Sequence, residues 1–187
     1  MASCGALGAH SQRDIRSLRR RYPDDRLLVN PRPSTCGQRS KKDERSGCMG
    51  RSRGGLTTKI HALVDADGRP IRLKLTAGHA YDGRSAADMF ETLGSRQILL
   101  ADRAYDRDGL RQSLKERGAW GCIRPMPTRV NIPAFSPWLY KQRNAVERFF
   151  NKLKHFRAIA TRYDKRDDNF LASIQLAAIR IWLRSYE

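Results

Sequence analysis

The sequence lacks a run of apolar residues long enough to cross a membrane, because no stretch approaches the ~20 residues that a spanning helix needs. Its start is rich in arginine and has no apolar core of a signal peptide. The four cysteines form no CxxC pair, and the four histidines complete no zinc spacing with them. These absences predict a soluble, reduced, cytoplasmic protein with no membrane contact.

Acidic residues are scarce beside basic ones. The chain has 37 Lys and Arg against 19 Asp and Glu, a formal net charge of +18. A surface of this sign attracts polyanions, because its cations displace the counterions that condense on nucleic acid. The charge therefore predicts a nucleic-acid partner, and a general basic protein of the ribosomal or chromatin type fits it as well as a DNA enzyme does.

The composition changes near Gly50. We expect residues 1–47 to be an irregular, disordered basic segment, because they are rich in Arg, Ser and Pro and their one apolar cluster, Leu27–Val29, is followed at once by prolines. Residues 48–187 should form the folded domain. No internal repeat is visible.

Regular elements follow one another through that domain. Alternating apolar residues in Lys59–Asp65 and Pro70–Thr76 predict a β-hairpin around the turn Asp67-Gly68. The elements expected after it are a helix over Asp82–Leu93, a buried strand over Gln97–Ala101, a helix over Arg107–Arg117, a strand over Ala119–Ile123, and helices over Asn144–Ala160 and Phe170–Tyr186. This order indicates the α/β class, with a mixed sheet flanked by helices.

Asp102 directly follows the buried strand. Open α/β sheets place their ligands beyond the carboxyl ends of strands, which makes this carboxylate a candidate. An isolated Asp there more often caps the next turn. Near the C-terminus, Arg143, Glu147 and Lys154 share a polar face of an amphipathic helix, where a surface Arg–Glu pair is worth only ~0.3–0.5 kcal/mol.

The spacing of these helix residues carries a resemblance. Tyr140, Arg143, Glu147 and Lys154 resemble the Y-(2)-R-(3)-E-(6)-K signature of insertion-sequence DDE transposases at every spacing. Three other segments are similar to family segments and stand in the family's order: Arg51–His61, Leu99–Asp106 around the second catalytic Asp, and Ala160–Lys165. The resemblance covers roughly residues 48–187.

The resemblance implies an RNase H-like fold and a DNA transposase that cleaves and transfers strands at insertion-sequence ends. Asp102 and Glu147 would hold Mg²⁺ or Mn²⁺ as catalytic ligands. Arg143 and Lys154 would bind phosphates or terminal bases, and Tyr140 would contact DNA or else brace the Glu147 helix. The implied partners are double-stranded DNA of the terminal inverted repeats and of the target, with a homodimer on DNA in the nucleoid.

The N-terminal part departs from the family pattern. The first catalytic Asp should lie on a first strand near position 25, where Asp24 and Asp25 stand. The Pro- and Ser-rich surroundings do not predict a central strand. We therefore expect a degraded first strand, and the alternative function is a truncated or frameshifted, catalytically inactive remnant that only binds DNA. A competing possibility is that Leu27–Asn30 fills the strand position and Asp24 or Asp25 supplies the ligand.

Three polar residues of the hairpin region are weaker candidates. His61 lies on the hairpin and is expected to be a packing or surface residue rather than a ligand. His79 and Asp82 follow the second strand, and Asp82 is expected to cap a helix rather than to bind metal.

Overall fold

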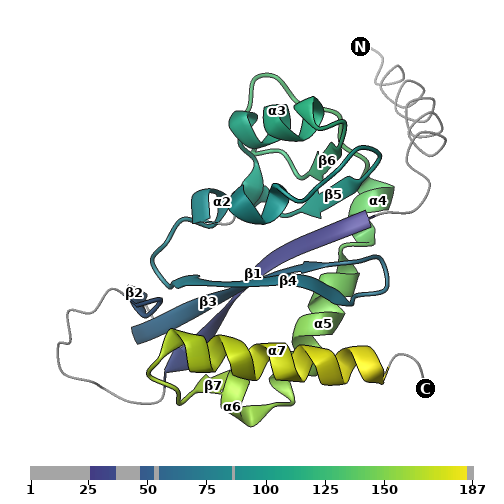
Figure 1. The fold of residues 1–187 in the computed structure, drawn as a ribbon. Helices are drawn as coiled ribbons and strands as arrows, with labels where there is room; N and C mark the ends of the chain where they lie inside the picture. Colours follow the sequence, from purple (N-terminus) through teal and green to yellow (C-terminus); the bar gives the residue numbers. More distant parts are fainter. Residues whose placement is uncertain (1–25, 37–46, 53–54, 86, 185–187) are drawn as a thin grey trace, which may run out of the picture.

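A mixed β-sheet crosses the molecule, and its central strand comes from the N-terminal part of the chain (Figure 1). The structure is a computed structural model that describes residues 26–36, 47–52, 55–85 and 87–184. Strand β1 (Arg26–Cys36) lies between β3 (Gly55–Val64) and β5 (Ile98–Ala101). The expected mixed sheet flanked by helices is confirmed.

The antiparallel half of the sheet is built on β3. It pairs with β1 on one edge, from Leu28 opposite Val64 to Thr35 opposite Thr57, and β4 (Pro70–Ala77) pairs with it as well. The short β2 (Gly50–Ser52) also pairs with β3. The predicted hairpin is thus confirmed, and Gly68 takes the positive φ of 84° that its turn requires.

The other half of the sheet is parallel. Strand β5 pairs with β1 over Arg26–Val29, and β6 (Trp120–Ile123) pairs with β5 along its whole length. All four residues of β5 are buried, as the continuous apolar run predicts. A two-residue strand, β7 (Thr161–Arg162), pairs with the end of β1 and was not foreseen.

The expectation that no central strand would form before residue 47 is wrong for residues 26–36, and Leu27–Asn30 does fill a strand position. Pro31 and Pro33 had argued against it, because proline cannot donate to a sheet hydrogen bond. Among the described strands, β5 accompanies β1 only as far as Val29 and β7 only from Thr35. Both prolines lie in the interval of β1 that pairs, among the described strands, only with β3.

Helices cover both faces of the sheet, with a separate apolar cluster under each layer. One face carries α4 (Pro137–Lys141), α5 (Asn144–Lys154), α6 (Arg157–Ala160) and α7 (Asp167–Leu183). The other carries the 3₁₀ turns η1 (Ala87–Phe90) and η2 (Arg103–Tyr105) together with α3 (Asp108–Glu116). Alternate residues of β3 and β5 enter the two clusters, as the two-residue period of a strand requires.

Helix boundaries differ from those expected. The predicted helix over 82–93 is divided into α2 (Asp82–Ser85) and η1, and the helix over 144–160 is interrupted between α5 and α6. Helix α7 begins at Asp167, three residues before the expected start at Phe170, and its N-cap residue Arg166 makes no side-chain capping bond. Helix α3 ends as predicted, with Gly118 at φ 70°.

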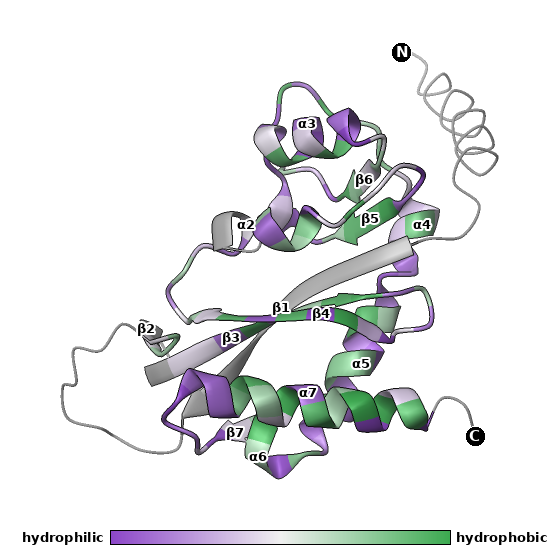
Figure 2. Ribbon diagram, viewed as in Figure 1, coloured by the Kyte–Doolittle hydropathy of each residue, from purple (hydrophilic) through white to green (hydrophobic). Residues whose placement is uncertain are grey.

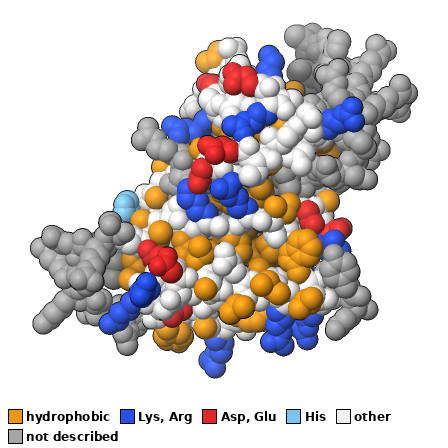
Figure 3. Space-filling model, in the orientation of Figure 1, with side chains coloured by type: hydrophobic (Ala, Val, Ile, Leu, Met, Phe, Trp, Pro, Cys, Tyr) orange, Lys and Arg blue, Asp and Glu red, His pale blue; other side chains and the backbone are white. Residues whose placement is uncertain are grey.

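Helix α7 is apolar along most of its length, as Figure 2 shows. Figure 3 shows hydrophobic side chains gathered over α7 and β4. Leu176, Ile179 and Leu183 are exposed by 68%, 54% and 65%, so they form an apolar stripe on the outer side of this helix. None of the helices in the described part of the chain combines the length and the apolar character that crossing a bilayer requires.

The buried guanidinium of Arg162 links segments that are far apart in the sequence. The side chain of Arg162 has no exposed surface, and its Nη2 lies 2.5 Å from Asp167 Oδ1 at the start of α7. Its Nε donates to the carbonyl of Asp164, and Nη1 donates to Thr58 Oγ1 on β3. The other oxygen of Asp167 accepts the backbone N–H of Cys48 at 2.6 Å. This network joins β3, β7, α7 and the residues before β2.

We expect Arg162→Leu to lower the free energy of unfolding by about 3 kcal/mol, because it removes one member of a buried ion pair and leaves its partners unsatisfied. Denaturant unfolding followed by circular dichroism measures this. The matched control is Arg166→Leu. The Arg166 side chain is 76% exposed, and its Nη2 lies 3.6 Å from Asp168 Oδ2. This substitution should change the free energy of unfolding by less than about 0.5 kcal/mol. Equal free energies of unfolding for the two variants would contradict the stabilising role of the buried Arg162 ion pair.

Candidate active site

Asp102 stands at the carboxyl end of β5, half-buried, where the buried strand gives way to η2. Its Oδ1 accepts the backbone N–H of Arg103 at 2.7 Å, so it does cap the following turn. No contact in the described part of the chain uses its other oxygen, Oδ2. The capping bond therefore orients the carboxylate and leaves one oxygen for a ligand.

Tyr140 reaches Asp102 from another element. It lies in α4, whose first turn is fixed by Pro137 and by the Ser136 hydroxyl, which accepts the N–H of Leu139. The Tyr140 hydroxyl donates to Asp102 Oδ1 at 3.3 Å, and its ring packs against Phe135. Burial raises the pKa of Tyr140, and the nearby carboxylate of Asp102 raises it further, so the hydroxyl stays protonated as a donor.

Arg143 connects Tyr140 to Glu147. Its guanidinium carbon lies 5.4 Å from the centre of the Tyr140 ring, and its Nη2 lies 2.7 Å from Glu147 Oε1. Glu147 is held by α5, whose opposite side buries Val146, Phe149 and their apolar neighbours against the sheet. Four predicted site residues thus form one contact chain, from Asp102 through Tyr140 and Arg143 to Glu147.

Two further features bear on ligand binding near this chain of contacts. Arg143 Nε and Nη1 are buried and have no hydrogen-bond partner among the described residues. Lys154 is not drawn into the contacts: it is exposed at the last residue of α5, two helical turns beyond Glu147. It remains on the same side of the helix as Glu147, because seven residues complete nearly two turns.

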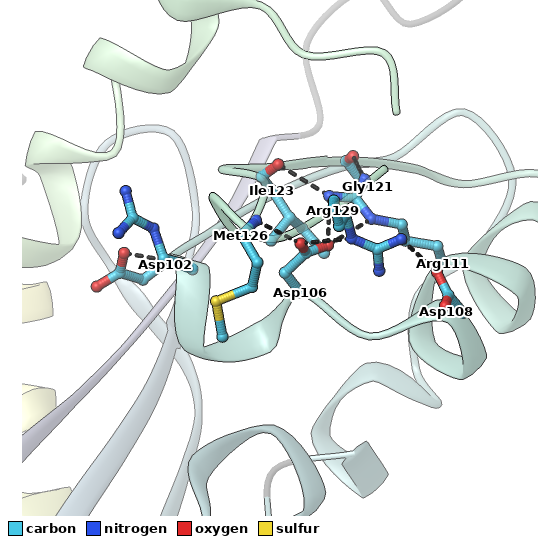
Figure 4. Close-up of polar contacts among 9 residues, drawn as sticks. Asp102, Asp106, Asp108, Arg111, Gly121, Ile123, Met126 and Arg129 are labelled. Atoms are coloured by element: carbon cyan, nitrogen blue, oxygen red, sulfur yellow. Dashed lines mark hydrogen bonds and ion pairs between the residues drawn. The ribbon is translucent and has the colours of Figure 1, made fainter. Parts of the chain in front are cut away.

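A second carboxylate of the same segment has a structural role that the sequence did not indicate. The side chain of Asp106 has no exposed surface, and its oxygens accept from Arg111 Nε, Arg129 Nε and the N–H of Met126. Figure 4 shows these groups converging on Asp106, while Asp102 lies apart from them. Arg111 also donates to the carbonyls of Gly121 and Ile123. These bonds hold the pKa of Asp106 below its usual range despite burial.

The hydrogen bonds between Asp106 and its two arginines hold the segments around Asp102 in place, and Asp102 itself takes no part in them. They join α3, β6 and the irregular chain after β6 to the turn that follows β5. Both oxygens of Asp106 accept hydrogen bonds from protein groups, and the side chain has no exposed surface. This carboxylate is therefore not available to a cation. Of the two acids in the segment Leu99–Asp106, only Asp102 has a free oxygen.

The three weaker candidates are placed as follows. Asp82 begins α2 and pairs with Lys59 Nζ at 2.8 Å, and His79 is exposed. His61 is fully buried, with Nδ1 3.1 Å from the Tyr105 hydroxyl and Nε2 2.7 Å from Thr76 Oγ1. His61 is therefore a packing residue whose two ring nitrogens already have partners.

Acidic ligands are few around the contact chain. Within the described residues, no group of three or more His, Cys, Asp or Glu side chains is close enough together to hold a metal ion. Asp24 and Asp25, the candidates for the first acidic ligand, lie outside the described residues. The described donor set suits Mg²⁺ or Mn²⁺ in kind, because it consists of carboxylate oxygens, but it contains only two of them.

Burial lowers the pKa of His61 to about 4. Below the unfolded-state pKa of about 6.5, His61 binds a proton in the unfolded chain but not in the folded chain. The free energy of unfolding should therefore fall as the pH falls from 7.5, by about 2 kcal/mol at pH 5. Urea unfolding at several pH values measures this. His61→Gln should flatten the dependence between pH 7.5 and 5, and the exposed-site control His155→Gln should keep it. A curve unchanged by His61→Gln would assign the dependence to other groups.

The similarity to known proteins extends over the same residues. Residues 31–182 match the family described as Transposase DDE domain. The chain is 42% identical over 130 residues to the "Putative transposase for insertion sequence element IS6501" of Brucella ovis, which covers 69% of this chain and 100% of that protein. It is 28% identical over 192 residues to the "Putative transposase for insertion sequence element IS402" of Burkholderia cepacia, covering 97% of this chain and 88% of that protein.

Among solved structures, the Mos1 transposase paired-end complex with left transposon end aligns with a TM-score of 0.48 and 15% identity, over 95% of this chain and 52% of the Mos1 chain. This chain therefore spans about half the length of Mos1. The family match runs from Pro31, inside β1, to Trp182, near the end of α7, and includes all of the contact chain. Because that match covers well over half of its residues, this chain belongs to the DDE transposase family.

Proposed function

We propose that this protein is a DNA transposase that cleaves and transfers strands at the ends of an insertion sequence, with Asp102 and Glu147 as its metal-binding carboxylates. The observation that carries the proposal is the contact chain at the carboxyl end of β5 in a member of the DDE family. Two carboxylates that are linked through Tyr140 and Arg143 near the end of a sheet strand, each with one oxygen left unpaired among the described residues, suit phosphoryl transfer better than a purely structural ion pair.

The strand order supports an RNase H-like version of the α/β fold. An antiparallel run of β4, β3 and β1 continues into the parallel strands β5 and β6. In this arrangement the carboxyl end of β5 lies beside the middle of the central strand, and α5 crosses the same face. A catalytic group on β5 and one on α5 can therefore serve one phosphate.

Asp102 and Glu147 would hold Mg²⁺ or Mn²⁺ through the oxygens that the protein leaves free. When bound, such ions lower the barrier of an in-line displacement by activating the attacking hydroxyl and stabilising the leaving oxygen. The protein's own residues orient the ligands: Arg103 N–H and the Tyr140 hydroxyl fix Asp102, and Arg143 fixes Glu147. Donor cleavage and strand transfer would use this one centre with different nucleophiles.

Arg143 is the group best placed to bind the DNA backbone. It is held by Glu147 and by the Tyr140 ring, and its Nε and Nη1 have no partner among the described residues. A guanidinium with two unpaired donors suits the paired oxygens of a phosphate once the atoms that bury these donors move aside. Lys154 lies farther along α5 and would extend the contact to a neighbouring phosphate, while Tyr140 would stay with Asp102 or contact a base.

The partner proposed is double-stranded DNA, both the terminal inverted repeats and the target. The net charge of +18 supports binding of a polyanion whose phosphates lie along a continuous path. Holding two element ends together requires two active sites, so we propose a homodimer on DNA, acting at the nucleoid.

A second function is favoured by the shortage of carboxylates. Strand β1 (RLLVNPRPSTC) contains no Asp or Glu, and no three-ligand metal group occurs among the described residues. A chain with only two acidic ligands would bind the terminal repeats without cutting them. It would then act as a catalytically inactive DNA-binding remnant that competes with an intact transposase.

Cleavage of terminal-repeat DNA in Mn²⁺ separates the two functions. If the chain is an enzyme, it nicks such DNA, and Asp102→Asn or Glu147→Gln should each lower the rate by about 100-fold or more, because even the partners that orient metal ligands are worth about 10- to 100-fold. Gel assays on labelled DNA measure this. The controls are Asp168→Asn and Glu116→Gln, two exposed acids outside the contact chain, and they should retain the rate. Cleavage that survives Asp102→Asn would refute the active-site assignment.

Binding without cleavage is tested by its salt dependence. Lys154→Ala should weaken binding uniformly across DNA sequences and reduce the slope of log affinity against log salt by about 1, because it removes one phosphate contact. Fluorescence anisotropy at several salt concentrations measures the slope. Lys115→Ala, an exposed lysine on α3, provides the matched control. If Lys154→Ala and Lys115→Ala give the same slope as the unmodified chain, Lys154 does not contact phosphate.

A further inference from the structure

The parallel pairing of β5 with β6 places a basic residue beside Asp102. The two strands pair residue by residue, and their last residues, Ala101 and Ile123, lie opposite each other. Asp102 and Arg124 are the next residues of the two segments. Neighbouring strands lie about 4.8 Å apart, so these two positions stand side by side at the carboxyl edge of the sheet.

Both side chains leave the sheet on the face that α4 and α5 cover. Leu100 and Cys122, two residues earlier in each strand, belong to the apolar cluster on that face. The backbone of Asp102 is still extended, with φ −75° and ψ 168°, and Pro125 restricts the residue before it to extended conformations. The alternation of the strands therefore continues to Asp102 and Arg124.

Arg124 is exposed, and among the described residues it forms no hydrogen bond or ion pair. It nevertheless lies near the contact chain. Burial is the main cause that raises the pKa of Tyr140, and the positive charges of Arg143 and Arg124 both oppose this rise. Two guanidinium groups from different elements therefore act on the hydroxyl that donates to Asp102.

The backbone that carries Arg124 is held on both sides. Strand β6 precedes it, and two residues later the N–H of Met126 donates to the buried Asp106 Oδ2 at 2.7 Å (Figure 4). Arg129 Nε donates to the same oxygen at 2.7 Å. A side chain on a fixed backbone loses less freedom when it binds a ligand, which favours binding. The bonds of Asp106 thus fix the starting point of the Arg124 side chain.

We infer that Arg124 is a second phosphate-binding arginine of this site, and that it holds the DNA backbone at the β6 side of Asp102. The inference rests on the proposed function. An exposed arginine taken alone indicates no more than a solvated side chain. Arg124 differs because its position is fixed beside Asp102 and its five donors are unpaired among the described residues. A planar guanidinium binds two phosphate oxygens at once.

Arg124 and Arg143 have separate tasks in this arrangement. Arg143 is already paired with Glu147 and packed on the Tyr140 ring, so it approaches a phosphate from the α5 side. Arg124 approaches from the end of β6. Contacts from two elements restrict how a phosphodiester can turn, and such positioning brings the reacting phosphorus into one orientation relative to Asp102.

The first test is binding of a duplex that carries the terminal repeat, measured by fluorescence anisotropy in EDTA at several salt concentrations. Arg124→Gln should weaken binding about tenfold or more and lower the slope of log affinity against log salt by about 1. Arg124→Lys keeps the charge but not the planar fork, so it should restore the slope and only part of the affinity. The matched control Arg166→Gln removes an equal charge from an exposed arginine before α7 and should change neither quantity.

The second test locates the phosphate. Single phosphates near the end of the repeat are replaced, one duplex at a time, by uncharged methylphosphonates. The unmodified chain should bind some of these duplexes less tightly, and Arg124→Gln should become insensitive at one of those positions, because the contact is already lost. A purely structural role of Arg124 would leave the pattern of sensitive positions unchanged.

Two results would overturn the inference. One is an Arg124→Gln variant with an unchanged melting temperature that keeps both the salt slope and the methylphosphonate pattern of the unmodified chain. The other is an equal loss of affinity in Arg124→Gln and Arg166→Gln, which would assign the effect to net charge. If the unmodified chain binds the terminal repeat no more tightly than an unrelated duplex, the proposed function fails instead.

Discussion

The register of the central strand is the constraint on which the rest of the structure depends. β1 holds the antiparallel half of the sheet on one edge and the parallel half on the other, so a slip by one residue would move its side chains to the opposite face. The same register sets the level at which β5 ends, and with it the position of Asp102. Since α5 packs on the face that β1 and β3 present, the placement of Glu147 depends on this strand as well. The geometry of the contact chain is therefore a consequence of sheet pairing as well as of the helix that carries Arg143 and Glu147.

Charged residues divide into those that serve the scaffold and those with atoms left over. Asp106 and Asp167 direct their oxygens at arginines and backbone N–H groups, and their pKa values are held below the usual range by these bonds despite burial. Such carboxylates stabilise the folded chain only while ionised, and that contribution is lost as pH falls through their lowered pKa values. Asp102 and Glu147 instead each have one oxygen outside any bond in the described part of the chain. In this respect Asp102 and Glu147 differ from Asp106 and Asp167.

The local sequence pattern correctly predicted those elements whose residues have the same kind of surroundings along their whole length. The hairpin and β5 followed from strict alternation and from a short apolar run, because those patterns record directly which faces are buried. Helix ends were less predictable, since the apolar period continues through Phe156 although the helix stops before it. β1 was expected only as the less favoured possibility, because Pro31 and Pro33 cannot donate to a sheet and their acceptance is a property of the assembled sheet. The spacing on α5 singled out four residues, but the bond from Tyr140 to Asp102 joins residues 38 apart and could not be read from either one.

The pairing of Asp102 and Glu147 with other side chains also has a physical consequence for the chain without metal. Three carboxylates gathered on one face repel one another, and the repulsion is relieved only when a cation binds. In this protein, Asp102 accepts a hydrogen bond from Tyr140, and Glu147 is paired with Arg143. The site is thus balanced by its own residues. The hydrogen bond and the ion pair of the contact chain hold these two carboxylates in place within the protein.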